Sequence, residues 1–218
     1  MVRPILQLAL DLTDSDKALE IAKNTQNDVD IIEIGTVLAI EAGLKSVRDI
    51  KAAVSDVQIL ADIRIIKAGG KLAKMAYEAG ADIVTIISDA TNETFEAVVA
   101  EKNKAVNRDV MIEINTSYTD DQLNYWKSLG LQHIIFHRGS EIVASHDSWE
   151  QAHFDEIARL SELGFKVYAT GGIGLKEISH FSGVPVYGFI IGRTISNAED
   201  PSKEAQKYNN EIAKWFED

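Results

Sequence analysis

Three carboxylate residues, Asp11, Glu33 and Asp62, lie at the ends of short apolar runs in the first third of the chain. If these runs form neighbouring strands, their carboxylates come close together, and carboxylates that lack partners repel and raise one another's pKa. A hard divalent cation would relieve this repulsion. Oxygen ligands without surrounding His or Cys suit Mg²⁺. The alternative is a structural ion-pair network with Arg64 and Lys67; the pattern favours the cation.

Glu113 and His137 end two later apolar runs and could handle protons. An imidazole with a pKa near neutrality donates or accepts a proton, and a neighbouring carboxylate can hold its tautomer. A single His in an apolar run is more often a hydrogen-bonded structural residue. Its position at a strand end, followed by Arg138, favours a catalytic pair here.

The last two apolar runs end in Thr170-Gly171-Gly172 and Gly192-Arg193. Glycines let backbone N–H groups approach an anion, a following helix adds its positive end, and Arg193 adds a charged fork. Loops after strands seven and eight of strand-helix barrels often bind phosphate. The alternative is that the glycines only relieve crowding in tight turns. Their position favours a site for a phosphorylated substrate.

Eight apolar, β-branched runs alternate with helix-compatible segments and must position these residues. The alternation predicts an α/β fold, a (βα)8 TIM barrel, rather than an open doubly wound sheet, whose glycine-rich first turn is missing. The 218 residues fit one domain, 1–218. The expected strands are Ile5–Leu10, Val29–Ile34, Val57–Ala61, Asp82–Ile86, Asp109–Ile114, His133–His137, Lys166–Ala169 and Val186–Ile191. Expected helices include Asp14–Thr25, Lys71–Ala79, Thr91–Val106, Thr119–Leu129, Trp149–Leu163 and Pro201–Phe216.

Composition argues against several classes of protein. The formal net charge of −12 disfavours binding to nucleic acid or to an anionic membrane, since both need clustered Lys and Arg. No apolar stretch approaches the roughly 20 residues of a membrane span, and the first residues lack a signal-peptide core. The chain contains no cysteine, which excludes disulfides and thiolate metal sites. We expect a cytoplasmic protein with neither nucleic acid nor membrane as a partner.

Short motifs at most of the expected strand ends match a known pattern, and they run through nearly the whole chain. The motifs are Leu8-Ala9-Leu10-Asp11, Val29-Asp30-Ile31-Ile32-Glu33-Ile34-Gly35-Thr36, Ala61-Asp62, Glu78-Ala79-Gly80-Ala81-Asp82, Phe136-His137-Arg138, Thr170-Gly171-Gly172 and Ile190-Ile191-Gly192-Arg193. Together they resemble the family of 3-keto-L-gulonate-6-phosphate decarboxylase and 3-hexulose-6-phosphate synthase, within the orotidine-phosphate decarboxylase group.

This resemblance implies a homodimer of (βα)8 barrels in which Glu33 and Asp62 hold Mg²⁺. It also implies that His137 and Glu113 manage the proton. The residues that it assigns to binding the substrate and its phosphate are Asp11, Thr36, Arg138, Thr170, Gly171, Gly172, Gly192 and Arg193.

The family's decarboxylase releases CO₂ from a β-keto acid and leaves a cis-enediolate, whose charge the metal stabilises. The synthase uses the same intermediate to attack formaldehyde. For this chain we predict Mg²⁺-dependent decarboxylation of 3-keto-L-gulonate 6-phosphate to L-xylulose 5-phosphate, in ascorbate catabolism. The alternatives are an aldolase of the synthase type and a sugar-phosphate-binding paralogue with weak catalysis.

The chain departs from the family pattern in two places. The signature Asp-x-Lys-x-x-Asp reads Asp62-Ile63-Arg64-Ile65-Ile66-Lys67, and the decarboxylase pattern His-Arg-Ser-Arg-Asp reads His137-Arg138-Gly139-Ser140-Glu141, closer to the synthase. Arginine is not a geometric substitute for lysine. We expect Arg64 to take the electrophilic role, and Lys67 to replace part of the function of the arginine that is missing at Ser140.

Overall fold

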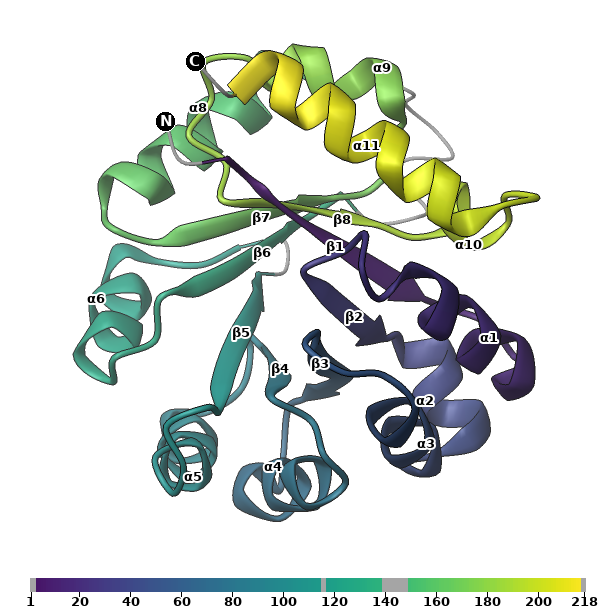
Figure 1. Cartoon of the computed structure of the whole chain (residues 1–218). Helices are drawn as coiled ribbons and strands as arrows, with labels where there is room; N and C mark the ends of the chain where they lie inside the picture. Colours follow the sequence, from purple (N-terminus) through teal and green to yellow (C-terminus); the bar gives the residue numbers. More distant parts are fainter. Residues whose placement is uncertain (1–2, 115–116, 139–148, 217–218) are drawn as a thin grey trace.

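The structure is a computed structural model that describes residues 3–114, 117–138 and 149–216. Eight parallel strands close into a barrel in sequence order, and β8 pairs with β1. Helices surround the strands, with α11 lying across the β1, β7 and β8 side (Figure 1). The predicted (βα)8 fold is confirmed. The strands are β1 (Ile5–Leu10), β2 (Ile31–Ile34), β3 (Gln58–Ile65), β4 (Ile83–Ile87), β5 (Asp109–Ile114), β6 (His133–His137), β7 (Lys166–Thr170) and β8 (Gly188–Ile191).

The helices connect consecutive strands and cover their outer face. Thr119 and Gln122 form a reciprocal capping box that fixes the start of α6, and Asp14 accepts a hydrogen bond from the Lys17 N–H at the start of α1. The helices are α1 (Ser15–Thr25), α2 (Thr36–Ala42), α3 (Lys45–Ala53), α4 (Gly69–Glu78), α5 (Asn92–Lys102), α6 (Asp120–Ser128), α8 (Gln151–Glu162), α9 (Leu175–Ile178), the 3-10 helix η1 (Ser179–Phe181), α10 (Arg193–Ser196) and α11 (Pro201–Phe216). Across the described ranges, no helix combines the length and the apolar content that a membrane crossing requires.

Two apolar layers hold the barrel together. The larger layer packs the outward strand residues against the helices. The smaller layer fills the barrel interior with one residue from each strand, so the barrel is a packed core and not a pore. The members of this interior ring are Ala9, Ile31, Leu60, Ile83, Met111, Ile135, Tyr168 and Ile190.

Three boundaries differ from the sequence expectations. β3 continues past Ala61 to Ile65, so Asp62 lies inside the strand and not at its end, because the pairing with β4 shifts register and resumes at Ile65. β8 begins only at Gly188, since the Val186 N–H donates to the Val184 carbonyl and not to a neighbouring strand. Two helices, α2 and α3, fill a segment for which we named no helix.

Candidate active site

Residues at the mouth of the barrel come from all eight strands. Side chains alternate along a strand, so the position two residues beyond each member of the interior ring again faces inward, one layer closer to the carboxyl ends. The early carboxylates and the late glycine therefore lie at the same end of the barrel. The residues at these positions are Asp11, Glu33, Asp62, Thr85, Glu113, His137, Thr170 and Gly192.

Glu33 and Asp62 are two buried carboxylates on adjacent strands, with exposed fractions of 7% and 5%. The Gln7 amide donates to Glu33 Oε2 at 2.5 Å, while Thr36 Oγ1 donates to Asp62 Oδ2 at 2.5 Å. Burial, followed by the charge of Asp62, raises the pKa of Glu33 well above its ordinary value. Burial also raises the pKa of Asp62, although its hydrogen bonds and Arg64 oppose the shift.

Arg64 forms ion pairs with two carboxylates of the mouth. Its Nε lies 3.4 Å from Asp62 Oδ2 and 3.1 Å from Glu113 Oε2. Burial opposes its charge, but Glu113 and then Asp62 raise the pKa of Arg64 above its ordinary value. The alternative of a structural ion-pair network therefore holds for Arg64. It does not extend to Lys67, which is exposed and forms no ion pair within the described part of the chain.

Negative charge exceeds positive charge in this cluster. Glu33 interacts electrostatically with Asp11, Asp62 and Glu113, whereas Arg64 is the cation that pairs with members of the cluster among the described residues. One guanidinium cannot neutralise four carboxylates. The oxygen-rich donor set and this surplus charge fit a hard divalent cation beside Glu33 and Asp62. Within residues 3–114, 117–138 and 149–216, however, no group of three or more His, Cys, Asp or Glu side chains has the geometry of a metal site.

His137 and Glu113 form a hydrogen-bonded pair on the adjacent strands β6 and β5. The His137 Nδ1 lies 2.7 Å from Glu113 Oε1, and the second oxygen of Glu113 faces Arg64. This contact fixes the ring and leaves Nε2 as the nitrogen that can exchange a proton. The pairing expected from the sequence is thus present in the geometry.

Asp11 is exposed at the mouth, directly after β1. The Val37 N–H at the start of α2 donates to Asp11 Oδ1 at 3.2 Å. A Cβ at Gly35 would lie 2.2 Å from the same oxygen, so only glycine there leaves room for the carboxylate. Asp11 is therefore held in place while remaining accessible to a ligand.

The glycine loops after β7 and β8 differ in what they need from glycine. Gly171 has φ +104°, and a Cβ there would lie 2.2 Å from the Arg138 carbonyl oxygen. Crowding alone thus requires glycine at this position, as the alternative interpretation held. Gly172 also has positive φ, at +66°, and Arg193 is exposed at the start of α10. Gly172 and Arg193 are therefore the residues that favour an anion.

Arg138 lies away from the mouth, because it follows the inward-facing His137. It is 3% exposed, and its guanidinium carbon lies 5.2 Å from the centre of the Trp149 ring in the outer layer. This position gives no support to the predicted substrate contact, which stays a prediction. Gly139, Ser140 and Glu141, where the chain departs from the decarboxylase pattern, lie outside the described residues.

Two polar residues of the site were missed in the sequence. Gln7 and Thr85 are fully buried and hydrogen-bond to Glu33 and Asp62. Each sits inside an apolar run, where we treated it as a strand residue without a role. The signal was present, because both occupy the inward-facing set of positions on β1 and β4.

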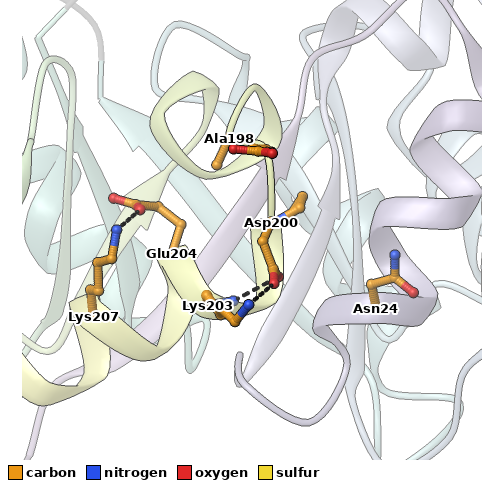
Figure 2. Close-up of a pocket in the computed structure, with 8 residues that line it drawn as sticks. Asn24, Ala198, Asp200, Lys203, Glu204 and Lys207 are labelled. Atoms are coloured by element: carbon orange, nitrogen blue, oxygen red, sulfur yellow. Dashed lines mark hydrogen bonds and ion pairs between the residues drawn. The ribbon is translucent and has the colours of Figure 1, made fainter.

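A separate surface pocket of about 660 Å³ lies between α1 and the start of α11, away from the mouth (Figure 2). Its lysines are already paired, Lys203 with Asp200 at 3.0 Å and Lys207 with Glu204 at 2.7 Å. It contains none of the candidate site residues. We therefore place the candidate active site at the barrel mouth.

The fold and the mouth together define a (βα)8 barrel of the enzyme class, with a carboxylate cluster, a His-Glu pair and a Gly-Arg strand end on one rim. The family model described as "Orotidine 5'-phosphate decarboxylase / HUMPS family" matches residues 4–208, and the chain belongs to this family. The resemblance found in the sequence is confirmed.

Individual relatives cover the whole chain. The 3-keto-L-gulonate-6-phosphate decarboxylase of Salmonella paratyphi B is 39% identical over 216 residues, which are 99% of this chain and 100% of the relative. The crystal structure of KGPDC from Streptococcus mutans in complex with a phosphosugar has a TM-score of 0.94 and 31% identity, covering 98% of this chain and 99% of that one. The 3-keto-L-gulonate-6-phosphate decarboxylase of Vibrio cholerae has a TM-score of 0.90 and 31% identity, covering 99% and 100%.

Proposed function

We propose that this protein is a carbon-carbon lyase that decarboxylates 3-keto-L-gulonate 6-phosphate to L-xylulose 5-phosphate. The observation that carries the proposal is the 39% identity to a decarboxylase of this name over the full length of both chains. The mouth supplies groups for the reaction: a carboxylate cluster, the cationic Arg64 and the His137–Glu113 pair.

We further propose Mg²⁺ as the cofactor, held by Glu33 and Asp62. The surplus of buried negative charge and the all-oxygen donor set support this choice. When bound, the ion would stabilise negative charge that develops on substrate oxygens. Arg64 provides a fixed positive charge beside the same carboxylates.

The proton is assigned to His137. Loss of CO₂ breaks a carbon-carbon bond and leaves an electron pair on the substrate, delocalised onto the neighbouring carbonyl oxygen. A proton must then reach carbon. With Nδ1 held by Glu113 at 2.7 Å, protonated His137 can deliver that proton from Nε2, and the carboxylate stabilises the imidazolium.

The proposal is tested by measuring CO₂ release from 3-keto-L-gulonate 6-phosphate with and without Mg²⁺. We expect turnover that depends on the metal and yields one CO₂ for each pentulose phosphate. Consumption of formaldehyde with a pentulose phosphate, but no CO₂ release, would make the protein an aldolase instead. Binding of the phosphosugar without either reaction would make it a binding protein.

Arg193 is proposed to bind the substrate phosphate, together with the loops after β7 and β8. The phosphosugar complex of the relative from Streptococcus mutans supports a ligand of this class. We expect Arg193→Ala to raise KM by about 10- to 100-fold, the value of a hydrogen bond to a charged group, with a smaller change in kcat. Steady-state kinetics check this. Arg48→Ala, at an exposed arginine of α3, is the matched control. An unchanged KM would contradict the assignment.

We propose a homodimer in which α2 and the segment after β3 contact the partner. Ile40 is 80% exposed on α2, Val37 beside it is 45% exposed, and Ile66 after β3 is 46% exposed, while α2 and β3 contact each other. Apolar side chains grouped in this way favour an interface. Sedimentation should give twice the chain mass of 24.0 kDa, and Ile40→Glu should lower it to the monomer mass. Val106→Glu, at an exposed residue after α5, is the control; a monomeric wild type would overturn the proposal.

The biological setting is also proposed. A 3-keto-L-gulonate 6-phosphate substrate suits ascorbate catabolism, and a chain without cysteine suits the reducing cytoplasm. Growth on ascorbate as carbon source, compared between wild-type and deletion strains, tests the first assignment. Fractionation of cells tests the second.

A further inference from the structure

The third strand carries an irregularity opposite a single residue of the fourth. Ala61 pairs with Val84, and the next regular pair joins Ile65 to Ile86. Three residues of β3 therefore face one residue of β4, Thr85. A bulge of this kind leaves backbone groups without ladder partners and redirects side chains near active sites.

The Thr85 hydroxyl takes over both missing tasks at the bulge. The Arg64 N–H donates to Thr85 Oγ1 at 2.9 Å, in place of a ladder bond. Thr85 Oγ1 donates to Asp62 Oδ1 at 2.7 Å. A hydroxyl has one hydrogen, and since Oγ1 accepts from Arg64, that hydrogen is committed to Asp62.

The residue's surroundings make this arrangement rigid. Thr85 has no exposed surface, so water does not compete for its hydroxyl. Arg64 has a left-handed backbone with φ +43°, a conformation that a non-glycine residue keeps only when its neighbours hold it. The N–H of that strained residue is the group that Thr85 binds. The other oxygen of Asp62 is held by Thr36.

We propose that Thr85 is a positioning residue that sets the orientation of the Asp62 carboxylate and of the Arg64 backbone together. This inference rests on the proposed function, because it assigns Asp62 and Arg64 to the reaction. Thr85 itself touches neither substrate nor metal. Through one hydroxyl it couples the carboxylate proposed to bind the cation to the arginine that stands in place of the family's lysine.

Thr85→Val tests the inference, because it preserves shape and removes only the hydroxyl. Partners of groups that bind a metal or reacting atoms are worth about 10- to 100-fold in affinity or activity when removed. We expect kcat to fall by about this factor, with a smaller change in KM. Thr85→Ser restores the hydroxyl and should recover most of the lost kcat. If Ser were as impaired as Val, packing and not the hydrogen bonds would explain the loss.

The matched control is Thr25→Val on α1. Thr25 is also fully buried, and its hydroxyl donates to the Ile21 carbonyl at 2.8 Å, outside the mouth. It reports the effect of the same chemical change on stability alone. We expect thermal midpoints to fall in both valine variants and kcat to fall only in Thr85→Val. Equal kcat in Thr85→Val and wild type would overturn the inference.

Crystal structures of wild type and Thr85→Val separate this inference from the proposed function. In the variant we expect the Asp62 carboxylate to turn away from its wild-type position and the β3 bulge to shift at Arg64. An unmoved Asp62 and an unmoved bulge would overturn the role of Thr85, whatever the enzyme's activity. A wild type without CO₂ release would overturn the proposed function, while the structures would still decide the role of Thr85.

Discussion

Replacing Arg64 with alanine is expected to lower kcat for CO₂ release by about 10²- to 10³-fold, the effect of removing one preorganised charge from an active site. The guanidinium lies 3.1 Å from Glu113 and 3.4 Å from Asp62, so its loss leaves the carboxylate cluster more negative where negative charge must develop on the substrate. KM should change less than kcat, because the charge acts mainly in the transition state. Steady-state kinetics at saturating Mg²⁺ check this.

The series Arg64→Ala, Arg64→Lys and Lys67→Ala separates the contributions of charge and shape. Arg64 has positive φ, and alanine, lysine and arginine all carry a Cβ, so this backbone strain is common to the series. Lysine keeps the charge and restores the family signature, so it should retain more activity than alanine. Lys67→Ala should have a smaller effect, since Lys67 is exposed. Full turnover in both alanine variants would show that neither residue has the assigned role.

Replacing Glu33 with glutamine is expected to abolish Mg²⁺-dependent turnover, with a loss of about 10³-fold or more, if Glu33 holds the metal. At 100 times its Kd, Mg²⁺ stabilises a protein by about 2.7 kcal/mol. For a chain of this size that raises Tm by about 5–10 °C. Scanning calorimetry should detect this increase in the wild type and little of it in Glu33→Gln.

Without metal, Glu33→Gln should be more stable than the wild type at neutral pH. Burial and Asp62 raise the pKa of Glu33, so the folded state binds that proton more tightly than the unfolded state does. Ionisation above this raised pKa therefore destabilises the fold, and glutamine removes the charge. Glu20→Gln on the exposed face of α1 is the control, with Tm unchanged in both conditions. An equal Mg²⁺ effect on wild type and Glu33→Gln would remove Glu33 from the metal site.

The sequence predicted the barrel because its signal is repeated eight times: apolar runs with both faces buried alternate with amphipathic segments. The carboxylates Asp11, Glu33 and Glu113 could be found because an ionisable residue at the end of such a run has to face the mouth. The class of residue and its place in the period were enough.

The pattern of contacts could not be predicted in the same way. A register shift depends on the neighbouring strand, so β3 was expected to stop before Asp62, and the link from Arg64 to Glu113 across two strands was not foreseen. Thr85 was overlooked because an isolated threonine is also an ordinary β-branched strand residue. Arg138 was taken for a mouth residue from its motif, but alternation turns it toward Trp149.

The most direct test of the account is a crystal structure of the protein with Mg²⁺ and a pentulose phosphate. We predict that the metal binds to oxygens of Glu33 and Asp62, and that the phosphate lies against Gly172 and Arg193, on the same rim of the barrel. Metal or sugar bound elsewhere, or a phosphate far from the loops after β7 and β8, would contradict it.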